Sequence, residues 1–238
     1  MSRGKANAMN RDMVEELCAC VEQAAADESI RGLMIASGCP KFFSGGFDLN
    51  EVFQYDRDTM REFFGRFIDL YQGLYALPKP VVAAVSGHAF AGGALLALAC
   101  DFRIMTDGQF GFAINEINMG VLLPPGLIRL ILDRVGVGHA RMVLLTGEAF
   151  SPAQALQMGL AAEVVEPESI AERAKALAFS LADKPPLAFA GFKRAIGEIA
   201  GRPPTDDDRR YLDEFIENWF SPEAEERKRA LKAAVDSR

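Results

Sequence analysis

A carboxylate, Glu116, follows two glycine-rich turns, and this combination of residue types can support proton transfer beside a stabilised oxyanion. The turns are Ser44-Gly45-Gly46 and Ala91-Gly92-Gly93. At the second turn, an apolar β-type run stops at Gly87 and an alanine- and leucine-rich helix restarts at Gly92. The first N–H groups of a helix lack partners within it and lie at the positive end of its dipole. Such a turn suits a bound anion or an oxygen that becomes negative during a reaction.

Composition and charge argue against several classes of protein. Half of the 238 residues are hydrophobic and a quarter are charged, as in an ordinary folded chain with a sizeable core. The formal net charge of −7 argues against nucleic acid or an anionic membrane as the main partner. The four cysteines form no CxxC pair and there are only two histidines, so no metal site is predicted. No secretory leader is recognised, which predicts a reducing, cytoplasmic location.

Residues 81–100 contain no Asp, Glu, Lys or Arg and are long enough to be considered as a membrane span. Three glycines, Ser86 and His88 interrupt this run, and Asp101 follows it at once. A buried strand and a buried helix joined by a glycine loop explain the pattern better. We therefore predict no membrane span.

The elements that must position the turns alternate between strand and helix. Short apolar runs typical of buried parallel strands lie at 33–36, from 81 onward, at 102–105 and at 163–165. Helices are predicted after the cap residue Asn10, around residues 60–74, over 126–135, over 139–146, between Ser151 and Gly159, and from 167 to the end. This alternation predicts an α/β core with parallel strands, followed by a helical layer.

Taken together, three segments resemble the crotonase superfamily, the enoyl-CoA hydratases and isomerases. They are KFFSGGFDL (41–49), SGHAFAGGALLALACDFRIM (86–105) and INEINMGVLLPPG (114–126). The resemblance implies a spiral core of ββα turns over residues 1–184 and a helical C-terminal region over 185–238 that forms trimers or dimers of trimers. It also implies a strand ahead of the segment RGKANAMN, so the sequence is expected to be truncated or to start downstream of the true start.

The resemblance assigns roles to the two turns and to the carboxylate. The backbone N–H groups of Phe47 and Gly92 would hold the thioester oxygen of an acyl-CoA and stabilise the enolate formed when an α-proton leaves. Hydratases of the family use two glutamates, and here Leu95 stands at the first position and Glu116 at the second. Hydration benefits from two carboxylates, whereas moving a double bond needs one group. The favoured function is therefore Δ3 to Δ2 isomerisation of an enoyl-CoA, with Glu116 as the single acid–base.

The rest of the substrate is expected to lie along residues that the resemblance also identifies. The backbone of the segment Lys5-Ala6-Asn7 would lie against the adenine and Lys41 would pair with a CoA phosphate, although a solvated lysine explains Lys41 nearly as well. Gly46 would complete the first turn, and Leu95, unless it is plain core, would line an apolar acyl pocket with Met119 and Leu122. No separate cofactor is expected, because CoA arrives as part of the substrate.

Other interpretations remain open at this point. Weak hydration, thioester hydrolysis or decarboxylation would use the same turns, and a non-catalytic acyl-CoA-binding protein would also explain Leu95. An isolated glutamate is usually solvated or capping, and only the two matching turns favour catalysis for Glu116. Asp48 more simply caps the turn after it, and His88 is expected to pack or hydrogen bond within its loop.

Overall fold

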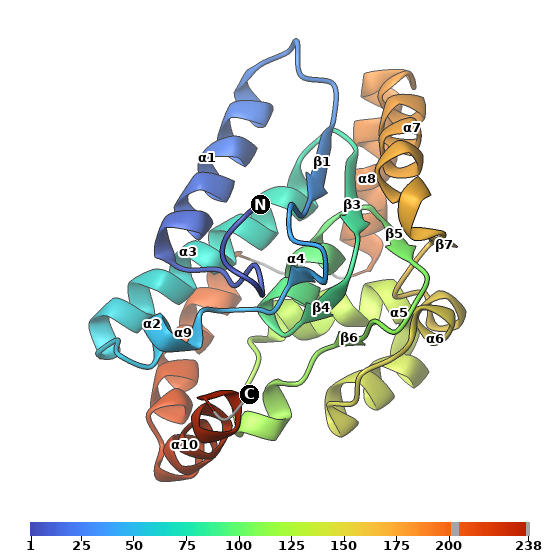
Figure 1. The fold of residues 1–238 in the computed structure, drawn as a ribbon. Coiled ribbons are helices and arrows are strands. Elements are labelled where there is room, and N and C mark those ends of the chain that lie inside the picture. Colours follow the sequence, from blue (N-terminus) through green and yellow to red (C-terminus); the bar gives the residue numbers. More distant parts are fainter. Residues whose placement is uncertain (201–204, 237–238) are drawn as a thin grey trace.

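The structure is a computed structural model that describes residues 1–200 and 205–236 and is built around two parallel β-sheets (Figure 1). The larger sheet has the order β1-β3-β5-β7, with β1 at Leu33–Ala36, β3 at Val81–Val85, β5 at Phe102–Thr106 and β7 at Glu163–Val165. The smaller sheet has the order β2-β4-β6, with β2 at Phe42–Ser44, β4 at His88–Phe90 and β6 at Phe112–Ala113. Neighbouring strands are parallel in both sheets.

The chain passes repeatedly from the larger sheet to the smaller one and then into a helix. The first such turn leads to α2 (Leu49–Val52) and α3 (Arg57–Ala76), the second to α4 (Gly92–Ala99), and the third to η1 (Glu116–Met119) and α5 (Pro125–Thr146). This arrangement confirms the predicted spiral of ββα turns.

Local sequence patterns did not place the strands of the smaller sheet, and their segments were expected to be turns and loops. His88 lies in β4 rather than in a loop. The strands have two or three residues each. Runs this short show no alternating pattern, and their pairing partners lie far away along the chain.

Both faces of the larger sheet are covered. Alternate residues of a strand point to opposite faces. Val82 and Ala84 of β3 pack towards α7 (Ile170–Ala182), whereas Val81, Ala83 and Val85 belong to the main core. All five residues of β3 are buried, as expected for a parallel strand enclosed on both sides.

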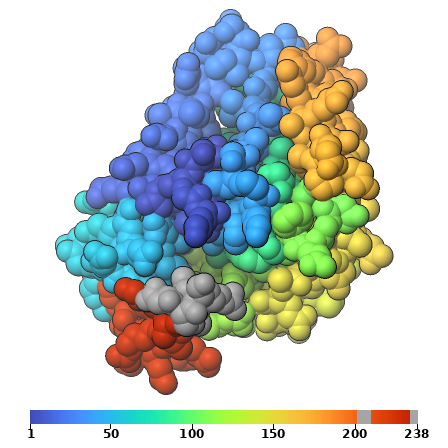
Figure 2. Space-filling view, viewed as in Figure 1, coloured from blue at the N-terminus to red at the C-terminus, as the bar shows by residue number. Residues whose placement is uncertain are grey.

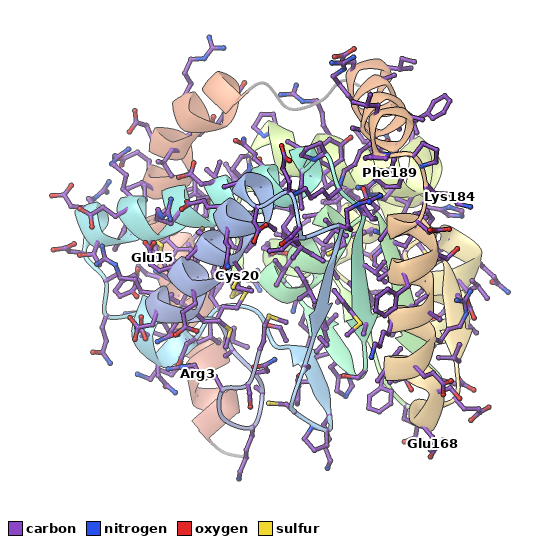
Figure 3. All side chains as sticks on the ribbon, turned by 90° about the horizontal axis from the view of Figure 1, so that it is seen from above. Arg3, Glu15, Cys20, Glu168, Lys184 and Phe189 are labelled. Atoms are coloured by element: carbon purple, nitrogen blue, oxygen red, sulfur yellow. The ribbon has the colours of Figure 1, made fainter. Side chains whose placement is uncertain are left out.

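Helix α1 (Arg11–Ala26) packs on α3 at the side of the molecule away from α7. Asn10 caps α1 as predicted, because its side chain accepts a hydrogen bond from the Met13 N–H at 3.1 Å. Figure 3, seen from above, shows α1 with the labelled Glu15 and Cys20, and α7 on the other side, between Glu168 and Lys184. Among the described residues, no helix combines the length and the apolar character needed to cross a membrane.

The two helices predicted over 126–135 and 139–146 form one element, α5, with a break at Gly136. Gly136 has φ 70° and ψ 168°, a conformation that favours glycine and interrupts the helix. After α5, Ser151 caps α6 (Pro152–Met158) and Gly159 ends it in the left-handed conformation, as predicted.

The C-terminal part consists of α8 (Pro186–Ile199), α9 (Thr205–Trp219) and α10 (Pro222–Asp236). Lys193 of α8 forms a mostly buried ion pair with Asp101, with Nζ 2.8 Å from Oδ2. Helix α9 packs on α3 and α5, and α10 packs on η1. In Figure 2, α9 and α10 are red and cover one end of the molecule, next to the cyan region of α2 and α3.

Candidate active site

The segments that follow the three strands of the smaller sheet emerge at one edge, because the carboxyl ends of parallel strands point the same way. The turn at Gly45-Gly46 follows β2, the turn at Ala91-Gly92 follows β4, and the segment leading to Glu116 follows β6. The topology therefore gathers three features that are far apart along the chain.

The two glycine turns are in contact. A Cβ atom on Gly46 would lie 3.0 Å from the carbonyl oxygen of Phe90 and 3.4 Å from the amide nitrogen of Gly92. Gly46 has φ 92°, which glycine adopts without steric cost. A Cβ atom on Gly93 would lie 2.5 Å from the carbonyl oxygen of Ser44. Glycine at these positions lets the backbone after β2 lie directly against the start of α4.

The N–H group of Phe47 points away from the segment that packs on it. The Met9 N–H donates to the Gly46 carbonyl at 2.7 Å, and the Asp48 N–H donates to the Met9 carbonyl at 2.8 Å. In such a parallel bridge, the residue between the two bonded groups directs its own N–H to the opposite side. Within the described residues no acceptor pairs with the Phe47 N–H. This donor is free to bind a ligand.

The second N–H group belongs to Gly92, the first residue of α4. Ala91 before it has φ 46° and ψ −125°, a conformation that costs about 1–3 kcal/mol for a residue with a Cβ. Two backbone hydrogen bonds fix Ala91, from its own N–H to the Ala113 carbonyl at 2.9 Å and from the Leu95 N–H to its carbonyl at 3.0 Å. The described chain offers the Gly92 N–H no acceptor, and the helix dipole makes its surroundings positive.

Glu116 begins η1 and is 7% exposed. Its Oε2 atom is buried and has no hydrogen-bond partner among the described residues. Burial raises the pKa of Glu116 from 4.5 to about 7, an effect that the residue's own backbone N–H opposes. A carboxyl group with this pKa can take up and return a proton near neutral pH.

These groups surround one cavity of about 220 Å³. Most of its lining is apolar, and charge interactions are stronger in such surroundings than in water. Of the described residues that line it, only Glu116 has a titratable side chain. The lining residues are Gly45, Phe47, Leu49, Phe64, Phe90, Ala91, Gly92, Leu95, Asn115, Glu116, Met119, Val121, Leu123, Phe215, Trp219 and Leu231.

Three lining residues come from the C-terminal helices and were missed by the sequence analysis: Phe215, Trp219 and Leu231. The Phe215 ring stacks on that of Phe64, with centroids 3.8 Å apart. The spacing of apolar residues along α9 indicates a buried face, but nothing in the sequence says what that face covers. The structure shows that it closes the cavity.

The residues predicted to contact the CoA part of the substrate, Lys5, Ala6 and Lys41, do not line this cavity. The Gly45 N–H donates to the Ala6 carbonyl at 2.8 Å, so the segment Lys5-Ala6 rests on the first glycine turn. Lys5 and Lys41 are exposed at the surface. Figure 2 shows this N-terminal segment, in dark blue, on the face of the molecule next to the lighter blue residues that follow β1.

A second, larger cavity of about 480 Å³ adjoins the first and shares Glu116, Val121 and Leu123 with it. Met119 and Leu122, both predicted to line the acyl pocket with Leu95, line different cavities. Met119 lines the first cavity, whereas Leu122 lines the second and is 48% exposed.

Two other polar residues have structural contacts. Asp48 caps α2 as predicted, accepting a hydrogen bond from the Asn50 N–H at 3.0 Å. His88 Nδ1 accepts from the Gly111 N–H at 2.9 Å, and burial lowers the pKa of His88. His88 therefore joins β4 to the segment before β6. The described residues hold no group of three or more His, Cys, Asp or Glu side chains that could bind a metal ion.

Comparison with known proteins identifies the fold. The family model "Enoyl-CoA hydratase/isomerase" matches residues 1–226. Mitochondrial enoyl-CoA delta isomerase 1 of Mus musculus is 32% identical over 172 residues, which are 72% of this chain and 60% of that enzyme. The 2,3-dehydroadipyl-CoA hydratase of Escherichia coli strain K12 is 33% identical over 195 residues, 80% of this chain and 73% of the hydratase. The structure of human mitochondrial delta3-delta2-enoyl-CoA isomerase superimposes with a TM-score of 0.93 at 24% identity, covering 99% of this chain and 92% of the human one.

The architecture is the crotonase fold, as the sequence predicted. The chain belongs to the enoyl-CoA hydratase/isomerase family. It matches only 60% of the length of the mouse isomerase. An isomerase and a hydratase match it at similar identity, so family membership alone does not decide the reaction.

Proposed function

We propose that this chain is an acyl-CoA enzyme that converts a 3-enoyl-CoA into the 2-enoyl-CoA, with Glu116 as its only acid–base group. One observation carries the proposal: Glu116, whose buried Oε2 has no partner among the described residues, lines the same cavity as Phe47 and Gly92, whose N–H groups have no acceptor there. Leu95 supports it, because it stands where the family's hydratases carry a second glutamate.

The proposed reaction has two proton transfers. The Glu116 carboxylate removes a proton from C2, and the electrons of that C–H bond form an enolate whose negative charge lies on the thioester oxygen. The N–H groups of Phe47 and Gly92 hold this oxygen. The thioester C=O then re-forms, the C1–C2 π electrons of the enolate make the C2–C3 double bond, and the electrons of the former C3–C4 double bond take the proton back from Glu116 at C4. The product has the same mass as the substrate.

The energetic contributions are of the expected size. Each N–H donor supplies roughly 3–4 kcal/mol of transition-state stabilisation in sites of this kind. A positioned acid–base group contributes a factor of about 10² to 10⁴. The pKa of Glu116, raised to about 7, suits a group that must both accept and return a proton.

Hydration is the second candidate. Proteins named as hydratases or dehydratases match the chain at 29 to 33% identity. Asn115 favours this alternative, because its buried Oδ1 has no partner among the described residues and it lines the cavity beside Glu116. A water molecule that donates to both oxygens would be held where addition to a double bond could begin.

The deciding experiment combines absorbance with product mass. Purified protein is incubated with a 3-enoyl-CoA, and the conjugated 2-enoyl-CoA is followed by its absorbance. An absorbing product of unchanged mass supports isomerisation, whereas a product heavier by one water supports hydration. Release of free CoA would indicate thioester hydrolysis, and loss of carbon dioxide from a carboxylated acyl-CoA would indicate decarboxylation. Binding of acyl-CoA without any product would favour a non-catalytic protein.

We also propose that the chain assembles as a trimer or as a dimer of trimers. Helix α8 supports this, because its only buried residue is Gly197 while large apolar side chains on it are exposed. They are Leu187, Phe192, Ile196 and Ile199. A second copy of the chain would cover them. Light scattering of the purified protein tests this assembly, and a monomer would contradict it. The cytoplasmic location stays a prediction.

A further inference from the structure

Glu116 stands on a very short element. The 3₁₀ helix η1 has four residues and ends at Gly120, which has φ 66°. Its last backbone bond runs from the Val121 N–H to the carbonyl of Glu116 itself, at 3.1 Å. A helix of one turn has few internal hydrogen bonds, so its position depends on contacts from outside.

Asn218, near the end of α9, provides such a contact. Its Nδ2 donates to the Gly120 carbonyl at 2.9 Å, and its Oδ1 accepts from the Leu122 N–H at 2.7 Å. The side-chain amide thus binds the two residues that flank Val121, as a neighbouring strand would. The N–H group of Val121 itself donates to the carbonyl of Glu116.

Helix α9 is itself fixed to the core. Phe215, Ile216 and Trp219 are at most 3% exposed, and the Phe215 ring stacks on Phe64 of α3. Phe215, Trp219 and Phe64 also line the cavity. Asn218 therefore connects a helix that forms one wall of the cavity to the turn that carries the carboxylate.

A second side-chain contact joins η1 to another helix. The Asn118 side chain donates to the carbonyl of Gly147, the residue that ends α5, at 3.1 Å. Asn118 within η1 is thus bound to the end of α5, and the residues just after η1 are bound to α9. Both supports are hydrogen bonds of a side-chain amide, which has a fixed geometry.

We infer that Asn218 is a positioning residue, which holds η1 so that the Glu116 carboxylate faces the N–H groups of Phe47 and Gly92. The C-terminal helices then complete the reaction site in addition to any role in assembly. This inference rests on the proposed function of Glu116 as the acid–base group.

The test uses three variants of the full chain and one matched control. Asn218→Leu removes both hydrogen bonds at similar volume, Asn218→Ala also removes bulk, and Asn218→Asp keeps the acceptor for the Leu122 N–H. The control is Glu217→Gln, which loses the exposed ion pair between Glu217 and Arg57 on the same helix. Exposed ion pairs contribute little to stability, so the control is expected to behave as wild type.

The expected result is a loss of rate without a loss of binding. Asn218→Leu and Asn218→Ala should lower kcat by about tenfold to a hundredfold, since displacing a catalytic group by about 1 Å has effects of this size. KM should remain near the wild-type value. The pKa in the kcat/KM profile should fall from about 7 towards the ordinary range of a carboxyl group, because a displaced Glu116 gains hydration.

Two measurements do not depend on the reaction. The first is hydrogen exchange: the Leu122 amide should exchange faster in the Asn218→Leu variant than in wild type. The second is infrared spectroscopy: the band of the Glu116 carboxyl is assigned by its loss in Glu116→Gln. This band should titrate at lower pH in Asn218→Leu. If wild type fails to isomerise, the proposed function is wrong, and the infrared titration still decides the role of Asn218. An unchanged titration of the Glu116 carboxyl in Asn218→Leu would overturn the inference. If the apolar variants do not fold, the same measurement on Asn218→Asp replaces it. Faster exchange alone would indicate only a structural role.

Discussion

Leu95 of α4 and Glu116 of η1 line the same cavity from successive turns of the spiral, and of the two only Glu116 can carry a proton. Leu95 is 1% exposed, so a buried apolar side chain stands where the family's hydratases carry a glutamate. Adding water to a double bond is helped by two carboxylates, whereas moving the bond requires one group that acts twice. The number of titratable groups in the cavity thus supports isomerisation over hydration.

Removing the carboxylate should abolish most of the activity. Glu116→Gln keeps the size of the side chain but cannot accept a proton, so the isomerisation rate should fall by about 10² to 10⁴-fold. Stopped assays with a 3-enoyl-CoA measure this. Glu148→Gln, which changes an exposed glutamate outside the cavity, is the control and should retain full rate. A Glu116→Gln rate within a few-fold of wild type would show that another group moves the proton.

The rate should depend on pH through the same residue. The base must be ionised in the free enzyme, and burial raises the pKa of Glu116 to about 7. We therefore expect kcat/KM to rise as the pH passes from 6 to 8, around that value, and to level off above it. A profile measured with buffers of constant ionic strength tests this. A profile already flat at pH 5 would show that Glu116 titrates like an exposed carboxylate.

The stability of the fold should change with pH in the opposite sense. Below pH 4.5 Glu116 is protonated in both the folded and the unfolded chain. Between pH 4.5 and about 7 the unfolded chain ionises while the folded state keeps the proton, so the contribution of Glu116 to stability is lost as the pH rises. Glu116→Gln lacks this loss and should gain about 3 kcal/mol over wild type between pH 4.5 and pH 8, because a change of one in pKa corresponds to about 1.4 kcal/mol. Urea unfolding of both proteins at the two pH values measures the difference, and an equal gap at both would contradict the prediction.

The larger sheet and most helices could be predicted from sequence because their signals are local. The buried strand at Val81–Val85 is a continuous apolar run, and Asn10 and Ser151 are cap residues directly before their helices. The smaller sheet could not be predicted in this way. A three-residue strand such as His88–Phe90 is defined by its neighbours β2 and β6, which other elements separate from it in the chain.

The candidate site shows the same division. Glu116, Phe47 and Gly92 were singled out by the glycine turns and by the order of the motifs, both of which are visible in the sequence alone. Trp219 and Asn218 were not, since neither has a local signal and each acquires its neighbours only when α9 folds onto the core. Contacts across such sequence separations follow from packing, which short motifs do not encode.

A second carboxylate at position 95 should change the chemistry. Leu95→Glu puts an ionisable group into the cavity that already holds Glu116, at a cost of several kcal/mol for burying a charge. We expect lower stability, with a melting temperature below that of wild type, and a new product heavier by one water. Leu95→Gln is the matched control, because it has the same shape without the charge. Mass spectrometry of the products decides, and an unchanged product in Leu95→Glu would show that this position does not select the reaction.

The close approach of α4 to β2 should not tolerate a side chain. In Gly93→Ala the new Cβ would lie 2.5 Å from the Ser44 carbonyl oxygen and 2.6 Å from the Ser44 Cβ, so the backbone that leads to Phe47 must move. We expect a loss of about 1–3 kcal/mol in unfolding free energy, together with most of the activity, because the two N–H donors separate. Gly191→Ala is the matched control in α8, where an added Cβ meets nothing within 4 Å. It should raise stability by about 0.5–1 kcal/mol, since alanine is the better helix former, and leave the rate unchanged. Urea unfolding and the isomerisation assay on both variants test the pair, and full activity in Gly93→Ala would mean that the spacing of the two donors is not critical.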